Sequence, residues 1–428
     1  MGIIKRIGLN IIPRVIKLNI FGFRRILFAV SRLITTLGNN NLIFGMAEFF
    51  SFSEDELEQN KRLQQTYLSS DPLKLKSVNW FIQGFQSKYL TGGPNSILSL
   101  VRFFSKQGFK QKFVILGGKS DVKSFERELR LGNFGLSLRD CKVTSTEDWD
   151  KIEFSDISIC TFWTTAYPLL KFNKTQAKYY FIQDDERTFY PSGSLFELAE
   201  QSYKFSFIGI TNSLELKEWY EREFNSNCHF ILPDIGEVNE IKRNSNNHSE
   251  SFKKIWFYAR PDANRNAYEI GMLALKKIKT LYPEIDITLA GSNTFKEPLF
   301  NFTDIGDIKD VRSLNDLYAN NDLCLYFITS HHTGIIPFEV MKRGSILLTN
   351  RRKYSTYLLK DNFNCIMTDL SVNEIVESFK KIYNDKQLQK RIIEGGEGTV
   401  SKLNSSASYS ELIESIKFKR FKPIDDIL

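Results

Sequence analysis

The chain alternates short apolar runs with helical patterns, and this constrains its fold more than any other feature. Two such runs, residues 78–82 (VNWFI) and 113–117 (FVILG), flank a helical stretch near residues 96–106. A strand, a helix and a second strand in that order form a βαβ unit, whose strands are parallel. Further strand-like runs follow at residues 157–162, 178–182 and 206–212. The first part of the chain is therefore predicted to be an α/β domain.

The same alternation begins again after a polar stretch at residues 237–250, which is rich in Asn and Ser and is predicted to be a linker. Apolar runs at residues 255–258, 285–290, 323–328 and 345–349 are separated by helical patterns at residues 266–281, 313–319 and 337–342. A long amphipathic helix is expected at residues 372–383. The second half is therefore predicted to be a doubly wound parallel sheet.

These patterns divide the 428 residues into four segments. We expect a basic helical extension over residues 1–75, Rossmann-like domains over residues 76–245 and 250–405, and a tail over residues 406–428. Two doubly wound sheets facing a cleft bind ligands at the carboxyl ends of their strands. Candidate functional residues are therefore sought at those ends.

The positive charge of the chain is confined to its start. The net charge is +8, from 58 basic and 50 acidic residues, yet no acidic residue precedes Glu48. Seven basic residues lie in that first segment: Lys5, Arg6, Arg14, Lys17, Arg24, Arg25 and Arg32. Since the remainder is nearly neutral, the charge argues against a nucleic-acid partner.

Residues 21–37 have the pattern of an amphipathic helix. Apolar residues recur at steps of three and four, while Arg25 and Arg32 lie on another face; the apolar residues are Phe23, Ile26, Val30, Leu33 and Leu37. Such a helix can lie on an anionic membrane surface, so residues 1–37 are one candidate membrane contact. The same stripe also suits packing on the body of the protein or on a second subunit, as in a homodimer, and the sequence leaves these alternatives open.

The five cysteines are scattered and never form a CxxC pair, so neither a disulfide framework nor a zinc site is indicated. The apolar stretches at the start are interrupted by charge, unlike a cleavable signal or a membrane span of about 20 apolar residues. We therefore expect a cytoplasmic protein, with peripheral association at the inner face of the cytoplasmic membrane as the alternative that residues 1–37 leave open.

The most informative motif is SHHTGIIPFEVMKRG, residues 330–344, which follows an apolar run and leads into a helix. It resembles the donor-binding segment of retaining glycosyltransferases of the GT-B fold, in which two acidic residues lie eight positions apart. The resemblance places Glu339 at the second acidic position, where the carboxylate binds the ribose hydroxyls of the nucleotide. His331 stands at the first acidic position, near the sugar, and His332, Thr333 and Gly334 join the donor site. Without the resemblance, Glu339 would be a solvated first-turn carboxylate.

A second match is Arg260 with Arg265, which follow the first strand of the second half. In the same family, basic residues at this spacing neutralise the diphosphate that leaves the sugar. Positioned cations stabilise such growing negative charge, and arginine can bind phosphate through two bonds. Two surface arginines on a loop are the plainer alternative.

Two segments of the first half are candidates for the acceptor side of the cleft. Gly92 and Gly93 precede a helix and permit close backbone approach to a ligand, although a simple turn explains them almost as well. Residues 180–194 form a polar and aromatic cluster with Gln183, Asp184 and Tyr190 at the end of a strand. These residues are candidates for contacting acceptor hydroxyls, and a structural role is the alternative.

The cluster at residues 180–194 resembles a segment of WsaF-type rhamnosyltransferases, which build bacterial surface polysaccharides. The resemblance implies dTDP-L-rhamnose as donor, a glycan acceptor that is lipid-linked if the first helix binds membrane, and no metal or other cofactor. Mg²⁺ bound by residues 184–186 is the alternative. The leaving phosphate is expected to accept the acceptor proton, so no protein nucleophile is required. A UDP- or GDP-hexose donor, epimerisation of a nucleotide sugar, and a silent carbohydrate-binding subunit of a glycan assembly complex remain open.

Overall fold

The computed structural model describes residues 50–84, 92–235, 252–292, 300–308, 311–352 and 357–427. The chain divides into two units, residues 1–53 and 54–428, and the elements below belong to the second. The predicted amphipathic helix at residues 21–37 and the predicted linker at residues 237–250 lie outside the described residues. None of the helices in the described ranges combines the length and apolar character that a membrane crossing needs.

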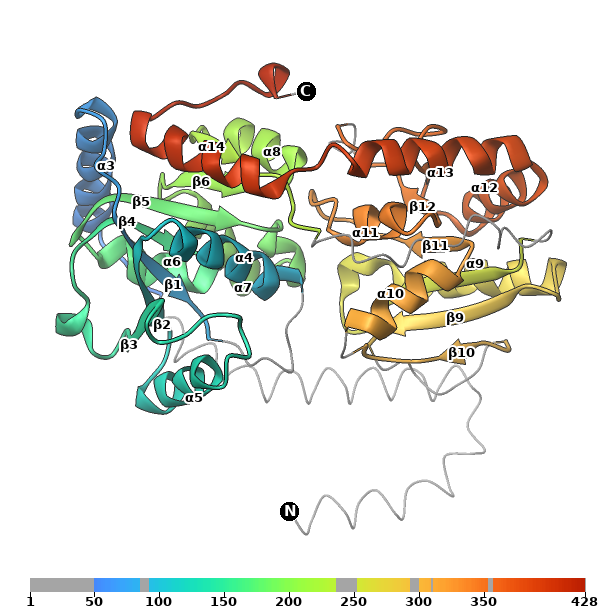
Figure 1. Cartoon of the computed structure of the whole chain (residues 1–428), viewed down its shortest axis with the longest axis horizontal. Helices are drawn as coiled ribbons and strands as arrows, with labels where there is room; N and C mark the ends of the chain where they lie inside the picture. Colours follow the sequence, from blue (N-terminus) through green and yellow to red (C-terminus); the bar gives the residue numbers. More distant parts are fainter. Residues whose placement is uncertain are drawn as a thin grey trace, which may run out of the picture. The chain divides into compact units, whose positions relative to one another are not determined.

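The amino-terminal half, residues 54–235, contains a seven-stranded sheet with strand order β3-β2-β1-β4-β5-β6-β7. Its strands are β1 Ser77–Ile82, β2 Lys110–Ile115, β3 Cys141–Ser145, β4 Ser155–Cys160, β5 Thr175–Ile182, β6 Ile208–Thr211 and β7 Cys228–Phe230. Its helices are α3 Glu54–Ser69, α4 Gly92–Lys106, α5 Lys119–Arg130, α6 Trp163–Lys171, α7 Ser194–Tyr203 and α8 Leu214–Phe224, with short 3-10 turns η2 Trp149–Lys151 and η3 Glu186–Phe189. Helices cover both faces of this sheet (Figure 1).

The carboxy-terminal half, from residue 252, contains a six-stranded sheet with strand order β10-β9-β8-β11-β12-β13. Its strands are β8 Lys254–Ala259, β9 Asp286–Gly291, β10 Thr303–Asp304, β11 Leu323–Tyr326, β12 Ile346–Asn350 and β13 Ile366–Thr368. Its helices are α9 Tyr268–Leu281, α10 Val311–Asn320, α11 Ile336–Lys342, α12 Val372–Asn384 and α13 Lys386–Val400, with the 3-10 turn η5 Asn264–Asn266. The chain ends with α14 Ser405–Phe418 and η6 Ile424–Asp426.

The strand pairs in both sheets are parallel, as the alternating pattern predicts. β1 shows why: five of its six residues are buried, and Trp80 lies opposite Phe113 of β2 and Ile159 of β4. A strand with both faces buried must be apolar throughout, which is typical of parallel sheets between helices. Both sheets therefore have the doubly wound order in which ligands bind at the carboxyl ends of strands.

Each half has its own hydrophobic core. In the carboxy-terminal half, one core packs α9 and α12 on one face of the sheet, and a second packs α10 and α11 on the other face. Burial of apolar area at about 25 cal/mol per Å² is the main driving force for these layers. The second core includes Tyr326 and Tyr318, which reappear in the candidate site.

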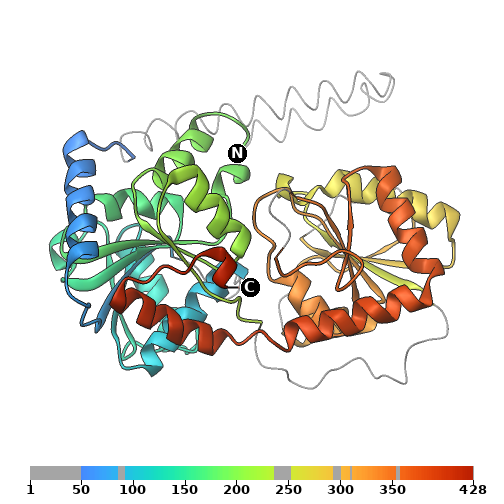
Figure 2. The same cartoon turned by 90° about the horizontal axis from the view of Figure 1, so that it is seen from above.

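Two segments outside the expected Rossmann-like ranges belong to the amino-terminal core. Residues 406–428 were set apart as a tail, yet α14 contributes Tyr409, Leu412, Ile413 and Ile416 to that core (Figures 1 and 2). Within the expected extension 1–75, Tyr67 of α3 donates a hydrogen bond to the Ile416 carbonyl at 2.6 Å. Both ends of this unit therefore pack on the same sheet.

Candidate active site

Two residues predicted for separate parts of the site contact each other where the two halves meet. Arg265 of η5 places its Nε 3.1 Å from Asp184 Oδ2, just after β5. The Arg265 guanidinium also lies 4.2 Å from the ring centroid of Phe189, in the same amino-terminal segment. A cation over an aromatic face is attracted by the ring quadrupole. The carboxyl ends of β5 and β8 thus approach each other.

Asp184 is an unusual partner because it is almost fully buried. Its side chain shows 10% exposure against 20% for Arg265. Burial raises the pKa of Asp184 above its ordinary value, although Arg265 and the hydroxyl of Ser330 lower it. A buried carboxylate next to a guanidinium is a strong local interaction.

The backbone fixes where Arg265 lies. Its carbonyl accepts hydrogen bonds from the Thr329 backbone N–H at 2.7 Å and from the Thr329 hydroxyl at 3.2 Å. The neighbouring Asn266 donates from Nδ2 to the Phe327 carbonyl at 3.1 Å. The turn η5 is therefore tied to the end of β11, directly before the motif at residues 330–344.

Arg260 directly follows β8 and so lies at the carboxyl ends of the strands of the carboxy-terminal sheet. Its Nη1 is 3.5 Å from the Tyr258 hydroxyl and its Nη2 is 3.9 Å from Asp262 Oδ2, with a quarter of the side chain exposed. Burial lowers the pKa of Arg260, but Tyr258, Asp262 and Tyr326 together raise it above its ordinary value. Arg260 is therefore a fixed positive charge with solvent access.

Tyr326 lies beneath the motif, and its ring packs 5.5 Å from the ring of Tyr258, which Arg260 contacts. Burial raises the pKa of the Tyr326 hydroxyl, and Arg265 is among the cations that lower it. Gly334 has φ +81°, and a Cβ at this position would overlap the Tyr326 hydroxyl oxygen. Only glycine combines this backbone conformation with so close an approach. The loop at residues 330–335 therefore passes directly over Tyr326.

Glu339 lies in the first turn of α11 and accepts a hydrogen bond from the Tyr318 hydroxyl at 2.8 Å, through Oε2. Burial raises the pKa of Glu339, while Tyr318, Arg343 and Lys342 lower it. The Tyr318 ring packs 5.5 Å from the ring of Trp256 in β8. One carboxylate oxygen of Glu339 is thereby bound by a tyrosine that packs on β8, the strand that Arg260 follows.

His331 faces the amino-terminal half. Its Nε2 is 3.7 Å from Asp185 Oδ2, and its ring stacks on Trp219 at 5.5 Å. Asp185 in turn forms a bidentate pair with Arg187, with both N–O distances at 2.9 Å. Burial lowers the pKa of His331, although Asp185 raises it. The imidazole is therefore neutral near pH 7, and it can donate and accept hydrogen bonds.

Residues 253–380 match the family model described as WsaF, C-terminal domain. This part of the chain is therefore similar to WsaF, and the chain as a whole has the GT-B fold. It is also 23% identical over 379 residues to the O-antigen biosynthesis protein RfbC of Myxococcus xanthus, an alignment that covers 86% of this chain and 29% of RfbC. The chain thus spans less than a third of that relative's length.

Solved structures resemble this chain along most of its length. HepE of Anabaena in complex with UDP superimposes with a TM-score of 0.58 at 13% identity, over 79% of this chain and 98% of HepE. TarM of S. aureus, crystallised with UDP, gives a TM-score of 0.62 at 8% identity, over 80% of this chain and all of TarM. At these identities the likeness shows the shared fold.

Gly92 and Gly93 begin α4 and lie next to other predicted site residues. A Cβ on Gly93 would be 3.9 Å from Gln183 Oε1, and one on Gly92 would be 3.8 Å from Ile335 Cγ2. The start of α4 therefore lies beside both the β5 edge and the loop at residues 330–335. A side chain added at either glycine would project toward Gln183 or Ile335.

Tyr190 contacts Trp163 of α6 and forms no ion pair among the described contacts. Its hydroxyl accepts a hydrogen bond from Trp163 Nε1 at 3.0 Å, and the two rings pack edge to face. The side chain is partly exposed. Tyr190 thus packs on α6, and the described contacts do not join it to Arg265.

The three consecutive acids at residues 184–186 have different partners. Glu186 Oε2 accepts from the Trp163 backbone N–H at 2.6 Å and from the Tyr180 hydroxyl at 2.8 Å, whereas Asp184 pairs with Arg265 and Asp185 with Arg187. Across the described part of the chain, no group of three His, Cys, Asp or Glu side chains is arranged to hold a metal ion.

Thr333 is buried and His332 is half-buried, and both lie beside residues that sequence reasoning missed. Burial, together with Arg352 and Arg265, lowers the pKa of His332 to about 3. Thr333 is 2% exposed and its hydroxyl lowers the pKa of Glu215, at the start of α8. Arg352 and Glu215 follow the carboxyl ends of β12 and β6, so searching every strand end for charged residues would have found both.

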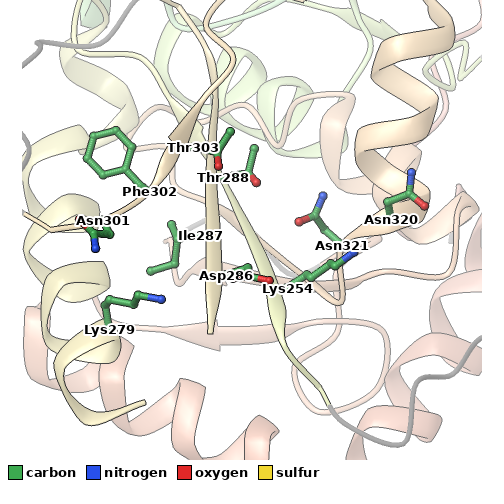
Figure 3. A pocket seen from close by; sticks show the side chains of 10 residues that line it. All are labelled: Lys254, Lys279, Asp286, Ile287, Thr288, Asn301, Phe302, Thr303, Asn320 and Asn321. Carbon is green, nitrogen blue, oxygen red and sulfur yellow. The ribbon is translucent and has the colours of Figure 1, made fainter. Parts of the chain in front are cut away.

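A hollow of about 600 Å³ lies at the opposite edge of the carboxy-terminal sheet (Figure 3). Its lining includes Lys254 and Asp286, the first residues of β8 and β9. The candidate site residues follow the carboxyl ends of β8 and β11, so this hollow, at the amino ends of β8 and β9, is separate from the candidate active site.

Proposed function

We propose that this chain is a glycosyltransferase that moves a sugar from a nucleotide diphosphate donor to a glycan acceptor in polysaccharide biosynthesis. One observation carries the proposal: both arginines lie beside the loop at residues 330–335, Arg260 through the packed rings of Tyr258 and Tyr326, and Arg265 through the hydrogen bonds that its carbonyl accepts from Thr329. Two guanidinium groups beside such a loop suit a diphosphate. The name of RfbC and the UDP bound to HepE and TarM support the same substrate class.

In the proposed reaction, Arg260 and Arg265 stabilise the negative charge that grows on the diphosphate as the bond to the sugar breaks. Glu339 accepts from the ribose hydroxyls of the nucleotide, with its orientation set by Tyr318. His331 contacts the sugar, and its plane is held by Trp219. The acceptor hydroxyl attacks from the amino-terminal side, where Gly92, Gly93, Gln183 and Asp184 lie.

The finer assignment is L-rhamnose from dTDP-L-rhamnose, transferred to a cell-surface or lipid-linked glycan without a metal ion. Its support is the WsaF-type match at residues 253–380 and the cluster at residues 180–194. Since each acid at residues 184–186 already has a partner, arginine is the more suitable counter-charge for the diphosphate. A membrane contact through residues 1–37 would bring the enzyme to a lipid-linked acceptor.

The test is a transfer assay with dTDP-L-rhamnose, UDP-glucose and GDP-mannose, with products followed by mass spectrometry in the presence and absence of EDTA. We expect turnover with one donor class and no effect of EDTA. Arg260→Ala and Glu339→Ala should each lower kcat/KM by about 10²–10³-fold, the cost of removing one group that stabilises the transition state. Arg130→Ala is the matched control, because Arg130 is 61% exposed and pairs only with Glu126 on α5 among its described contacts. Wild-type turnover in both site variants would refute the assignment.

A catalytically silent carbohydrate-binding subunit is the second candidate. The Arg265–Asp184 pair favours it, because a diphosphate-binding arginine is here engaged by a carboxylate. Donor turnover in the same assay, by transfer or by hydrolysis, would exclude it.

A further inference from the structure

Buried polar atoms without hydrogen-bond partners gather where the two halves meet. In folded proteins about nine in ten buried polar groups are hydrogen-bonded, so such a group of atoms calls for an explanation. Five of these atoms are Glu215 Oε1, Thr333 Oγ1, His332 Nδ1, Gln183 Oε1 and Asn212 Oδ1. All five follow the carboxyl end of β5, β6 or β11.

Glu215 is the best defined member of this set. The Ser213 hydroxyl, which also caps α8, donates to Glu215 Oε2 at 2.7 Å. Oε2 is therefore held in place, while Oε1 has no hydrogen-bond partner even though the residue is only 3% exposed. An unpartnered carboxylate oxygen in such a position is costly unless something donates to it.

Thr333 faces Glu215 from the other half. Its hydroxyl lowers the pKa of Glu215, yet no hydrogen bond of ordinary geometry joins the two side chains. One turn along α8, Glu218 accepts a hydrogen bond from the Tyr357 hydroxyl, so α8 also contacts the segment after β12. Glu215 and Thr333 thus face each other at the junction of the two halves.

The chemistry of these atoms selects the ligand. Glu215 Oε1 only accepts when ionised, and the Thr333 hydroxyl both donates and accepts. A carboxylate disfavours an anion, so the diphosphate belongs with the arginines. The complementary group is neutral and rich in hydroxyls, as a sugar ring is.

We propose that Glu215 and Thr333 form a subsite that binds hydroxyl groups of a sugar ring, with Glu215 as a specificity-determining residue contributed by the amino-terminal half. This inference rests on the proposed function and deepens it. Thr333 is adjacent to Gly334 in the donor motif, so the ring of the nucleotide sugar is the expected occupant. The ring of a glycan acceptor presents the same chemistry.

The test compares affinities by isothermal titration calorimetry for dTDP, UDP and GDP and for dTDP-L-rhamnose, UDP-glucose and GDP-mannose. Glu215→Ala should weaken binding of the preferred nucleotide sugar by about 10–100-fold, and Thr333→Val by about 3–10-fold, as expected for hydrogen bonds to a charged and a neutral group. Binding of the matching nucleotide diphosphate should not change. Glu218→Gln, which keeps an acceptor for Tyr357, is the matched control and should leave both affinities unchanged.

A second arm adds methyl glycosides of the three sugars to protein saturated with nucleotide diphosphate. Loss of glycoside binding in Glu215→Ala, with nucleotide-sugar binding intact, would assign the subsite to the acceptor and still support a sugar site. Unchanged affinities in both arms, or equal losses for nucleotide and nucleotide sugar with a lowered Tm, would overturn the subsite while leaving the proposed function in place. Failure of the wild-type chain to bind any nucleotide would overturn both.

Discussion

At the scale of single residues, the Arg265 side chain has two alternative anionic partners: Asp184 in the structure described here, and the diphosphate in the proposed complex. The distance of 3.1 Å makes an ion pair of Arg265 Nε and Asp184 Oδ2, although Nε forms no hydrogen bond of ordinary geometry. A diphosphate bound by Arg265 would compete with this carboxylate, because both are anions that need the same N–H groups. Asp184 is therefore an internal counter-anion of the candidate donor site.

Replacing Asp184 with Asn should strengthen binding of the preferred nucleotide diphosphate by about tenfold, because Arg265 then lacks its competing anion. Calorimetric titration of wild type and variant measures this. Asp262→Asn is the matched control, since Asp262 is 61% exposed and 3.9 Å from Arg260 Nη2, so its removal should have little effect. Weaker binding in Asp184→Asn would show that the carboxylate positions Arg265 instead of competing for it.

Glu186 predicts a pH dependence of stability. Burial raises its pKa well above the ordinary value of about 4.3, and Asp184 and Asp185 add to the shift. The native state then binds more protons than the unfolded state, so the free energy of unfolding falls as the pH rises through the interval above that ordinary value. Glu186→Gln should flatten this fall, as measured by urea denaturation at a series of pH values. An unchanged slope would contradict the burial of an ionisable Glu186.

At the scale of secondary structure, the loop between β11 and α11 shapes the candidate donor site. Gly334 lies on Tyr326, and Pro337 is the second residue of α11, where its missing N–H is harmless. Asn350 Oδ1 accepts from the Ile328 backbone N–H at 2.8 Å, which fixes the end of β11 to the end of β12. The loop is therefore held at both of its ends before α11 orients Glu339.

Gly334→Ala should lower the free energy of unfolding more than Gly108→Ala, its matched control. Both glycines have φ near +80°, but a Cβ on Gly108 would meet no atom within 4 Å. We expect a cost of about 1 kcal/mol for Gly108→Ala from the backbone alone, and about 1–3 kcal/mol more for Gly334→Ala from overpacking. Chemical denaturation measures both. Tyr326→Phe should recover part of the loss, and equal costs at the two glycines would argue against the close contact.

At the scale of the whole molecule, the parallel sheets followed from the sequence because apolar runs buried on both faces have a distinctive pattern. The expected strands at residues 78–82 and 255–258 lie within β1 and β8. The packing of α14 on the amino-terminal core could not be predicted from the sequence, because the apolar face of a helix does not indicate which sheet it packs against. The sequence named Arg265 and Asp184 each as a candidate site residue, but their contact depends on how the carboxyl ends of the two sheets meet. The same is true of Glu215, whose partner Thr333 is 118 residues further along the chain.

The most direct test of the central claim is calorimetric titration of dTDP, UDP and GDP into wild type and into Arg260→Ala, Arg265→Ala and Glu339→Ala. The claim is that these three side chains bind one nucleotide diphosphate. It predicts that at least one nucleotide binds the wild-type chain and that each substitution weakens this binding by about tenfold or more, with an unchanged Tm in the absence of ligand. Binding that survives all three substitutions, or no binding by the folded wild-type chain, would contradict it.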